Sequence, residues 1–271
     1  MHTEVVYVCT DDRYPELAAS LRSLIESRTA FDSVAVYRVD AGDETWTSSD
    51  PRITVRNVGP LCGDYFFANK LYLCDSDADR VVFLDTDTLV LQPLDTLWTD
   101  SDAAFRARYG RLNYSPDWGT TVWQRTFESI GVPVIPMFNA GVLVFQHQTH
   151  RLIRNTWAEF IGRYLDSTWQ PPFPDWRMPE QFALSPALSV HSVTYSPLSS
   201  REHGFGWEPD VWRSCETGAL DRESFVVLHT SHHLFRDYYR KLMPGAESSQ
   251  PDSASGAHEP LSRQAAVHDR K

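Results

Sequence analysis

Short apolar runs that end in polar residues predict the buried strands of an α/β sheet. Three such runs lie at 5–9 (VVYVC), 33–39 (SVAVYRV) and 80–84 (RVVFL), and a shorter strand is expected at 53–55. Between the first two runs, Pro15 opens a predicted helix, where its missing N–H is harmless. The apolar face of that helix is made by Leu17, Leu21, Leu24 and Ile25.

The second half of the chain continues this alternation less regularly. The run 138–145 (FNAGVLVF) predicts another core strand, and Thr149 is expected to cap the helix that follows it. The remaining predicted elements are helices at 66–74 and near 121–130 and strands at 189–195 and 224–228. Strands that alternate with helices over short links predict an α/β domain with a mainly parallel central sheet.

Size and charge limit the domain organisation and the partners. The chain has 271 residues, of which 42% are hydrophobic, and a formal net charge of -11. We expect one domain over 1–243 and a tail at 244–271, where Ser, Ala, Pro and mixed charges predict disorder. Nucleic-acid binding is not expected, because neutralising phosphates requires clustered Lys and Arg.

Cysteine usage and hydropathy favour a soluble protein of the cytoplasm. The four cysteines form no C-x-x-C pair and fit no zinc template, while Cys9 and Cys74 lie in apolar stretches as buried thiols do. The N-terminal sequence MHTEVVYVCTDD turns polar too soon for a signal peptide. No apolar run approaches the roughly 20 residues that span a bilayer, so no transmembrane segment is expected.

The motif Asp85-Thr86-Asp87 is the first candidate for chemistry. It directly follows the buried run 80–84, and ligands in open α/β sheets gather beyond the carboxyl ends of strands. Residues i and i+2 of a strand also point to one side. Two hard oxygen ligands suit Mg²⁺ or Mn²⁺, which can bridge carboxylates to a diphosphate. The alternative is a pair of solvated caps, which is how we interpret the similar triplets at 75–77, 77–79 and 100–102.

Five patches of sequence occur in an order typical of one enzyme family. In the best patch, 69–98, a Lys-Leu pair, an apolar strand, Asp-x-Asp-Thr-Leu-Val and a later Asp-x-Leu-aromatic follow one another. The other patches are 10–14 (TDDRY), 138–142 (FNAGV), Glu180-Gln181 and His229. Over most of residues 4–235 the chain therefore resembles glycosyltransferase family 8, to which glycogenin and bacterial lipopolysaccharide galactosyltransferases belong.

The resemblance implies a GT-A fold, in which a nucleotide-binding α/β sheet carries an acceptor region. It implies an enzyme that moves a hexose from a UDP-sugar to a carbohydrate, glycan or protein acceptor, with Mn²⁺ or Mg²⁺ as cofactor. The family retains the anomeric configuration, so the product would be α-linked. Metal and cations would stabilise the departing UDP, whose phosphate oxygen could accept the acceptor's proton, so no strong protein nucleophile is required.

The resemblance also implies which residues bind the donor. Thr10, Asp11 and Tyr14 would hold the uridine, with Tyr14 near the base. Lys70 would contact the donor phosphates or the sugar, and Thr86 would lie between the two carboxylates of the motif. From the residues alone, Tyr14 could instead be a core residue at a helix start, and Lys70 could lie along a helix surface.

The resemblance further implies the metal ligands and the sugar pocket. Asp85, Asp87 and His229 would bind the metal, an assignment that suits an imidazole ligand. The sugar pocket would be formed by Asn139 and Ala140, with Glu180 and Gln181 beside the anomeric carbon. Without the resemblance, Asn139 could satisfy a strand end, Gln181 could be solvated, and a lone histidine is more often structural.

Two departures from the family pattern bear on turnover and on the donor. The family has Asp-Gln where this chain has Glu180-Gln181. After its metal-binding histidine the family has a glycine and then a lysine that grips the diphosphate, whereas here His232 replaces the glycine and no lysine follows in place. Arg236 or His233 could take over the phosphates. The pattern also leaves open whether His232 or His233 is the metal ligand.

Other functions fit the sequence less well. A haloacid-dehalogenase-type phosphatase also has a strand followed by Asp-x-Asp, but that motif opens its domain and is followed by a small Gly-Thr or Gly-Val pair. A sugar nucleotidyltransferase has an N-terminal glycine-rich loop, and 8–14 contains no glycine. A binder that lost turnover is the remaining alternative, favoured by the altered residues after His229.

The acceptor is not identified by the sequence. Aromatic rings stack well on sugars, and several tryptophans fall in irregular segments. They are Trp118, Trp123, Trp169, Trp176, Trp207 and Trp212. The segment 203–207 (HGFGW) is expected to be a flexible, glycine-flanked loop that could border the acceptor.

Overall fold

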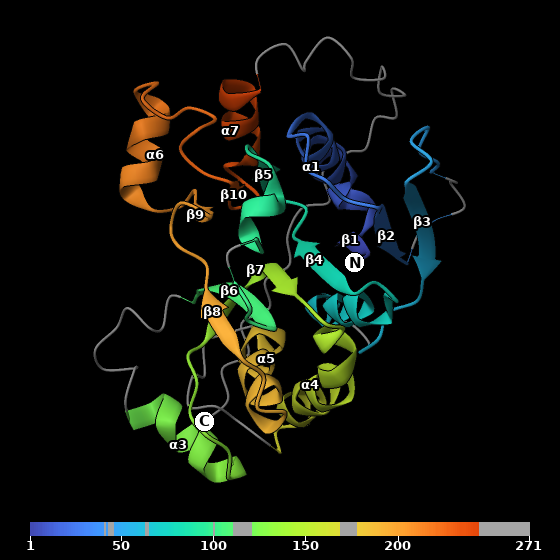
Figure 1. The fold of residues 1–271 in the computed structure, drawn as a ribbon, viewed down its shortest axis with the longest axis vertical. Helices are drawn as coiled ribbons and strands as arrows, with labels where there is room; N and C mark the ends of the chain where they lie inside the picture. Colours follow the sequence, from blue (N-terminus) through green and yellow to red (C-terminus); the bar gives the residue numbers. More distant parts are fainter. Residues whose placement is uncertain are drawn as a thin grey trace, which may run out of the picture.

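The chain folds around a central sheet that has helices on both faces (Figure 1). The computed structural model describes residues 1–40, 42, 46–62, 65–99, 101–110, 121–168 and 178–243. The tail predicted to be disordered, with Trp118, Trp169 and Trp176, lies outside the described residues. Among the described residues, no helix combines the length and the apolar character needed to cross a membrane.

The elements alternate between strands and helices through most of the chain. The strands are β1 (Thr3–Cys9), β2 (Ser33–Val39), β3 (Ile53–Val58), β4 (Arg80–Leu84), β5 (Thr88–Val90), β6 (Phe105–Tyr109), β7 (Phe138–Phe145), β8 (Tyr195–Pro197), β9 (His203–Phe205) and β10 (Val227–His229). The α-helices are α1 (Tyr14–Glu26), α3 (Thr121–Ile130), α4 (Thr149–Leu165), α5 (Pro179–Val190), α6 (Pro209–Glu216) and α7 (Phe235–Leu242). Within the described ranges, the 3-10 helices are η1 (Asp11–Arg13), η2 (Phe66–Asp75) and η3 (Leu94–Leu97).

The strand order places a crevice at the carboxyl ends of β1 and β4. The seven-stranded sheet has the order β3-β2-β1-β4-β7-β6-β8, and β1 pairs in parallel with both β2 and β4. The chain moves outward from β1 through β2 to β3, then returns to the other side of β1 as β4. Ligands of open α/β sheets bind at such a switch point. The predicted α/β class with a mainly parallel sheet is confirmed.

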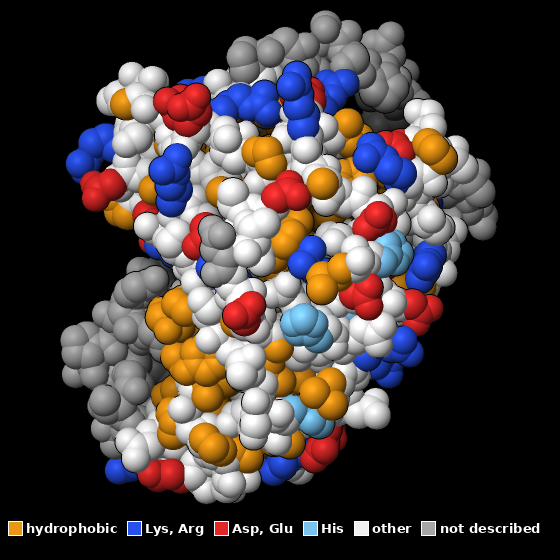
Figure 2. All heavy atoms as spheres, viewed as in Figure 1, with side chains coloured by type: hydrophobic (Ala, Val, Ile, Leu, Met, Phe, Trp, Pro, Cys, Tyr) orange, Lys and Arg blue, Asp and Glu red, His pale blue; other side chains and the backbone are white. Residues whose placement is uncertain are grey.

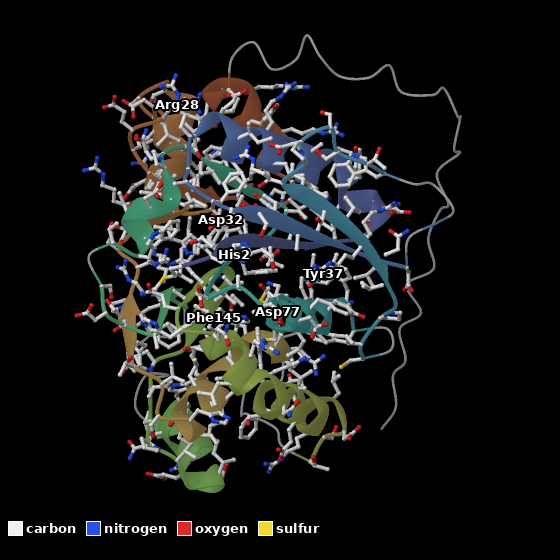
Figure 3. The ribbon with its side chains drawn as sticks, turned by 45° about the vertical axis from the view of Figure 1, so that its right-hand side comes forward. His2, Arg28, Asp32, Tyr37, Asp77 and Phe145 are labelled. Atoms are coloured by element: carbon white, nitrogen blue, oxygen red, sulfur yellow. The ribbon has the colours of Figure 1, made fainter. Side chains whose placement is uncertain are left out.

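Alternate residues of β1 pack into two different hydrophobic clusters. Val5 and Tyr7 pack with Leu17 and Leu21 of α1, whereas Val6 and Val8 pack with the cluster that contains α4 and α5. Neighbouring residues of a strand point to opposite faces, so a run that is apolar throughout needs cover on both sides. That second cluster runs across the sheet from Tyr37 on β2 to Phe145 on β7 (Figure 3).

A smaller sheet extends the molecule beside this crevice. It has the order β5-β10-β9, with β10 antiparallel to β5 and parallel to β9. It packs with α6 and α7 through a third apolar cluster that includes Leu89, Leu228, Phe235 and Tyr238. Because β5 follows β4 after three residues, the small sheet is attached directly to the end of the motif-bearing strand.

The helix predicted at 66–74 is confirmed and is the 3-10 helix η2, whereas three other local predictions are wrong. The strand predicted at 189–195 is the end of α5 and a turn before β8. All residues of 179–189 are buried, so α5 shows no amphipathic period in the sequence. Thr149 does not cap α4, because its hydroxyl donates to the Gln146 carbonyl (2.6 Å). The predicted loop 203–207 begins with the buried strand β9.

Trp157 connects α4 to the start of α5. Its side chain is fully buried, and its indole N–H donates to the Glu180 carbonyl (2.8 Å). We predict that Trp157→Ala lowers the free energy of unfolding by about 3–5 kcal/mol, because a large cavity opens and the carbonyl loses its donor. Urea unfolding followed by circular dichroism measures the change, and Trp123→Phe, a smaller volume change in the same core, should cost less.

Candidate metal and donor site

The motif at 85–87 forms a turn between β4 and β5 whose backbone is fixed from both sides. The Asp85 N–H donates to the Gly141 carbonyl of β7 (2.8 Å), next to the β4–β7 pairing. Thr88 donates its N–H (3.2 Å) and its hydroxyl (2.7 Å) to the Asp85 carbonyl. The two carboxylates therefore converge through a tight turn, and not through the strand alternation that we predicted.

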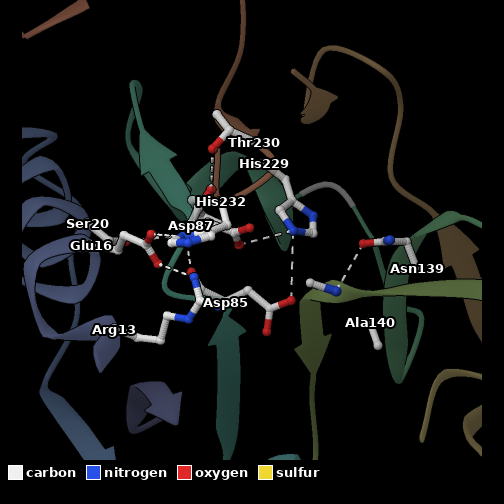
Figure 4. A network of polar contacts seen from close by, with 12 residues as sticks. Arg13, Glu16, Ser20, Asp85, Asp87, Asn139, Ala140, His229, Thr230 and His232 are labelled. Atoms are coloured by element: carbon white, nitrogen blue, oxygen red, sulfur yellow. Dashed lines mark hydrogen bonds and ion pairs between the residues drawn. The ribbon is translucent and has the colours of Figure 1, made fainter. Parts of the chain in front are cut away.

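His229 meets these carboxylates from the smaller sheet. It ends β10, and the next N–H, of Thr230, donates to the Asp87 carbonyl (2.9 Å). Nε2 of His229 lies 3.3 Å from Oδ1 of Asp87 and 3.8 Å from Oδ2 of Asp85 (Figure 4). One ligand atom from each residue lies within 4.8 Å of the others, and the described part of the chain holds no second group of this kind. Two carboxylates and an imidazole suit Mn²⁺.

Gly141 on β7 leaves room for the His229 ring. A Cβ at position 141 would lie 2.0 Å from Cε1 and 2.4 Å from Nδ1 of His229. Non-bonded atoms do not approach so closely, so a side chain at this position would push the imidazole away from the carboxylates. The donor set and this space together fit a bound divalent cation.

A second buried histidine contacts the far side of the His229 ring. Nε2 of His203 lies 3.4 Å from Nδ1 of His229, and the rings are stacked with centroids 5.5 Å apart. Burial, and then the neighbouring His229 and Arg108, hold the pKa of His203 well below its usual value. Sequence reasoning missed this contact because the segment was taken for a flexible loop.

Lys70 connects the acidic turn at 85–87 to the residues near Glu180. Its Nζ donates to Asp85 (3.0 Å) and to the Ala140 carbonyl (3.1 Å), and it lies 3.8 Å from the Glu180 carboxylate. Burial lowers the pKa of Lys70, but Asp85 and Glu180 outweigh it, so the net pKa is raised and the ammonium stays charged. Lys70 is thus a buried cation, and not the surface lysine of the alternative interpretation.

Glu180 and Gln181 are buried beside this lysine. Glu180 accepts a hydrogen bond from the Tyr65 hydroxyl, and burial raises its pKa against the opposing effect of Lys70. Oε1 of Gln181 accepts from the Ala140 N–H (3.1 Å) and from Nδ2 of Asn139 (3.3 Å). The structure therefore gathers the four predicted sugar-pocket residues into one network with Lys70.

A cavity of about 460 Å³ opens at the carboxyl ends of β1 and β4. This volume is typical of sites for small molecules and cofactors. Its lining comes from the loop after β1, from η2, from the acidic turn and from the segment after β10. The lining residues are Val8, Thr10, Asp12, Arg13, Glu16, Phe66, Phe67, Lys70, Phe83, Asp85, Thr86, Asp87 and His232.

The loop after β1 places its predicted residues differently. Thr10 lines the cavity, whereas the carboxylate of Asp11 binds Arg38 (2.7 Å) and the Gly42 N–H (3.1 Å). The Arg38 hydrogen bond, followed by that of Gly42, lowers the pKa of Asp11. The Tyr14 ring packs edge to face on Trp46, with centroids 5.4 Å apart. Of the three residues predicted to hold the uridine, Thr10 thus lines the cavity, whereas Asp11 and Tyr14 are not among its lining residues.

The structure distinguishes between the three histidines that the sequence left open as the metal ligand. Only His229 approaches the carboxylates of the motif, which favours it over His232 and His233 as the metal ligand. His232 lines the cavity with its Nδ1 against the Glu16 carboxylate, and Nε2 of His233 lies 3.4 Å from the Ser231 hydroxyl. Within the described residues, the cavity lining includes neither His233 nor Arg236, the two predicted phosphate partners.

The sheet order and the motif at the switch point define a GT-A type of nucleotide-sugar fold. The fold is shared with solved glycosyltransferases, so the predicted GT-A class is confirmed and the family 8 resemblance is supported at the level of fold. No protein-family profile matches the chain, and no curated protein matches it by sequence.

Three solved structures illustrate the likeness. The galactosyltransferase LgtC, in complex with donor and acceptor sugar analogs, is 17% identical with a TM-score of 0.59, over 92% of this chain and 98% of that one. The bifunctional glycosyltransferase WbbM is 14% identical with a TM-score of 0.58, over 90% of this chain and 50% of that one. GlyE of Streptococcus pneumoniae TIGR4 is 16% identical with a TM-score of 0.53, over 84% and 54%.

The space at Gly141 gives a test of the metal site. We predict that Gly141→Ala weakens Mn²⁺ binding and destabilises the protein by about 1–3 kcal/mol, because the new methyl group displaces His229. Gly162→Ala is the matched control: nothing lies within 4 Å of a Cβ there, and alanine favours the helix α4. Calorimetric titration with Mn²⁺ measures both variants, and equal affinities would contradict the assignment of His229.

Proposed function

We propose that this chain is a metal-dependent glycosyltransferase that moves a hexose from a UDP-sugar donor and retains the anomeric configuration. The carrying observation is that Asp85 and Asp87 line a cavity beyond the carboxyl ends of β1 and β4 and that His229 meets their carboxylates. Acidic clusters are common on protein surfaces, but this one lies where α/β folds bind nucleotides. The shared fold with glycosyltransferases supports the same reading of the site.

The acidic turn is proposed to hold Mn²⁺ or Mg²⁺ against the donor diphosphate. A divalent cation bound there would neutralise the charge that develops on the leaving UDP. Lys70 fixes the Asp85 carboxylate by a hydrogen bond of 3.0 Å and adds a permanent positive charge at the cavity wall. Thr86 lines the cavity between the two aspartates, where it would contact the diphosphate or the ribose.

The donor sugar is proposed to lie against Asn139 and Ala140. The Asn139 side chain and the Ala140 N–H both donate to the Gln181 side chain, and the Ala140 carbonyl accepts a hydrogen bond from Lys70. Glu180 is only 2% exposed and is not among the residues that line the cavity, whereas Lys70, 3.8 Å away, lines it, so we infer that Glu180 acts on the donor sugar through Lys70. The proposed mechanism requires no protein nucleophile, and the acceptor's proton would pass to the departing phosphate.

The nucleoside is proposed to lie along the loop after β1. Thr10 lines the cavity, and in the same loop and at the start of α1 the Asp11 carboxylate binds Arg38 and the Tyr14 ring packs on Trp46. An anchored carboxylate and a packed aromatic ring would present ordered edges to a ribose and a uracil. We therefore keep the uridine assignment for all three residues.

Arg13 is proposed to replace the diphosphate-gripping lysine of the family. It lines the cavity, and its ion pairs with Asp12 (3.4 Å) and Glu16 (3.6 Å) are longer than hydrogen bonds. Its guanidinium therefore keeps donors for a phosphate, with a planar fork that suits two oxygens. Figure 4 shows Arg13 and Glu16 beside the acidic turn.

A nucleotide-sugar binder without turnover is the second candidate. The observation in its favour is that His232 contacts Glu16 at the cavity, where the family has a glycine. This pair narrows the cavity and uses a carboxylate beside the proposed diphosphate position. Binding of a donor without hydrolysis or transfer would identify this candidate, and hydrolysis of a generic phosphate ester would instead indicate a phosphatase.

The proposed function predicts metal-linked nucleotide binding. We expect UDP or one UDP-sugar to raise the melting temperature in the presence of Mn²⁺ but not in EDTA, because ligand that binds only the folded state stabilises it. Asp87→Asn should remove the shift and also donor hydrolysis. The control is Asp77→Asn, whose surface ion pair with Arg151 contributes at most about 1 kcal/mol. A panel without any metal-linked shift would refute the proposal.

The role of Arg13 predicts a selective loss of diphosphate affinity. Arg13→Gln should weaken UDP binding about 10–100-fold, which corresponds to the loss of about 1.5–3 kcal/mol from charge-assisted hydrogen bonds. Uridine binding should change little, because it carries no phosphate. Arg236→Gln is the matched control, since Arg236 is not part of the described cavity lining. A loss of UDP affinity in the control variant alone would transfer the role to Arg236.

A further inference from the structure

His203 and His229 form a buried imidazole pair that extends away from the metal-binding turn. They lie on the adjacent parallel strands β9 and β10, and His203 is fully buried. Nε2 of His203 is 3.4 Å from Nδ1 of His229, and the other nitrogen of His229 faces Asp87 at 3.3 Å. The chain therefore places three groups in a line, from His203 through His229 to the carboxylate.

Metal binding imposes one tautomer on His229. A neutral imidazole binds a cation through the nitrogen that carries no proton, so Nε2 must be free and Nδ1 must carry the proton. That N–H is buried and needs an acceptor. Histidine ligands usually donate their second N–H to a carboxylate or a carbonyl, which fixes the ring and strengthens the ligand. Here the atom at hydrogen-bond distance is Nε2 of His203.

His203 can act as that acceptor only in one state. It must be neutral, with its own proton on Nδ1, so that the lone pair of Nε2 points at His229. The Nδ1 atom of His203 is buried and has no hydrogen-bond partner among the described residues. An unpaired polar atom opposes folding, and a phenylalanine would fill this space between Phe205 and His229 without that cost.

We propose that His203 is a positioning residue that accepts the Nδ1 proton of His229 and so holds His229 in the metal-binding tautomer. The inference rests on the proposed metal site. Without metal, the pair can adopt the opposite arrangement, in which Nε2–H of His203 donates to His229 and Nε2–H of His229 donates to Asp87. Metal binding then exchanges the tautomers of both rings, and each ring carries one proton before and after.

Matched variants at position 203 separate this role from simple packing. His203→Gln keeps an acceptor oxygen near the position of Nε2, whereas His203→Asn is too short to reach His229 and His203→Phe keeps the ring without an acceptor. We expect the Phe and Asn variants to bind Mn²⁺ about 10–100-fold more weakly, the size found for lost partners of metal-binding histidines, and the Gln variant to stay close to the parent protein.

The measurement is calorimetric titration with Mn²⁺ alone, with the melting temperature of each variant taken in EDTA. If all three variants bind Mn²⁺ as the parent does, or if affinity follows the melting temperature and not the acceptor, His203 is only a packing residue. Nitrogen NMR of the imidazoles with diamagnetic Mg²⁺ checks the tautomer exchange directly. A parent protein that binds no Mn²⁺ would overturn the metal site and this inference together, whereas binding that is unchanged in the Phe and Asn variants would overturn this inference alone.

Discussion

The site depends on holding carboxyl groups of like charge close together. Asp85 and Asp87 share one turn, and Glu180 lies within 3.8 Å of the lysine that also binds Asp85. Lys70 is the fixed counter-charge for this group, since its pKa is raised in spite of burial. A buried ion pair of this kind contributes little net stability, because desolvation offsets the attraction. Its value lies in geometry: Nζ of Lys70 is 3.0 Å from both carboxylate oxygens of Asp85, and this contact fixes the Asp85 side chain at the cavity wall.

The candidate metal ligands are brought together at the turn 85–87 by strand pairing in both sheets. The strand β5 starts immediately after Asp87, and β10 pairs with it in a register that sets His229 opposite Thr88. On the other side, β7 continues the sheet and brings Gly141 against the imidazole. The acidic motif, the glycine and the histidine are distant in sequence, but each is fixed by a strand that contacts the same turn. A change in any one of these pairings would move a ligand.

The sequence predicts the parts of the fold whose hydrophobic pattern is strong. The strands β1, β2, β4 and β7 and the helices α1 and α4 are found where apolar runs or a single apolar face indicated them. The prediction fails for β5 and β9, which have three residues each, and for the full length of α5, which is buried on all sides. Helical periodicity carries information only when one face of the helix is solvated, so a helix buried on all sides is hard to recognise, and strands of three residues are too short to show an apolar run.

The sequence predicted which residues meet in the candidate site only for those that belong to the patches resembling glycosyltransferase family 8. Asp85, Asp87 and His229 converge as expected, whereas Arg13 and His203 enter the site through contacts that no local pattern indicates. Arg13 lines the cavity because η1 turns the chain directly after β1. The spacing of residues around Arg13 in the sequence does not indicate that turn. The position of His203 beside His229 is set only by the register in which β9 pairs with β10.

The net charge of the chain would make binding of the proposed diphosphate donor depend on local cations. At -11 the protein repels an anionic diphosphate, and salt weakens that repulsion only beyond about 8 Å at physiological ionic strength. On the face that Figure 2 shows, acidic side chains are scattered among basic ones. Attraction from cations inside the cavity would offset this repulsion. Arg13, Lys70 and a cation held by the two aspartates would supply this attraction. Metal and diphosphate should then bind cooperatively, because each neutralises charge that opposes the other.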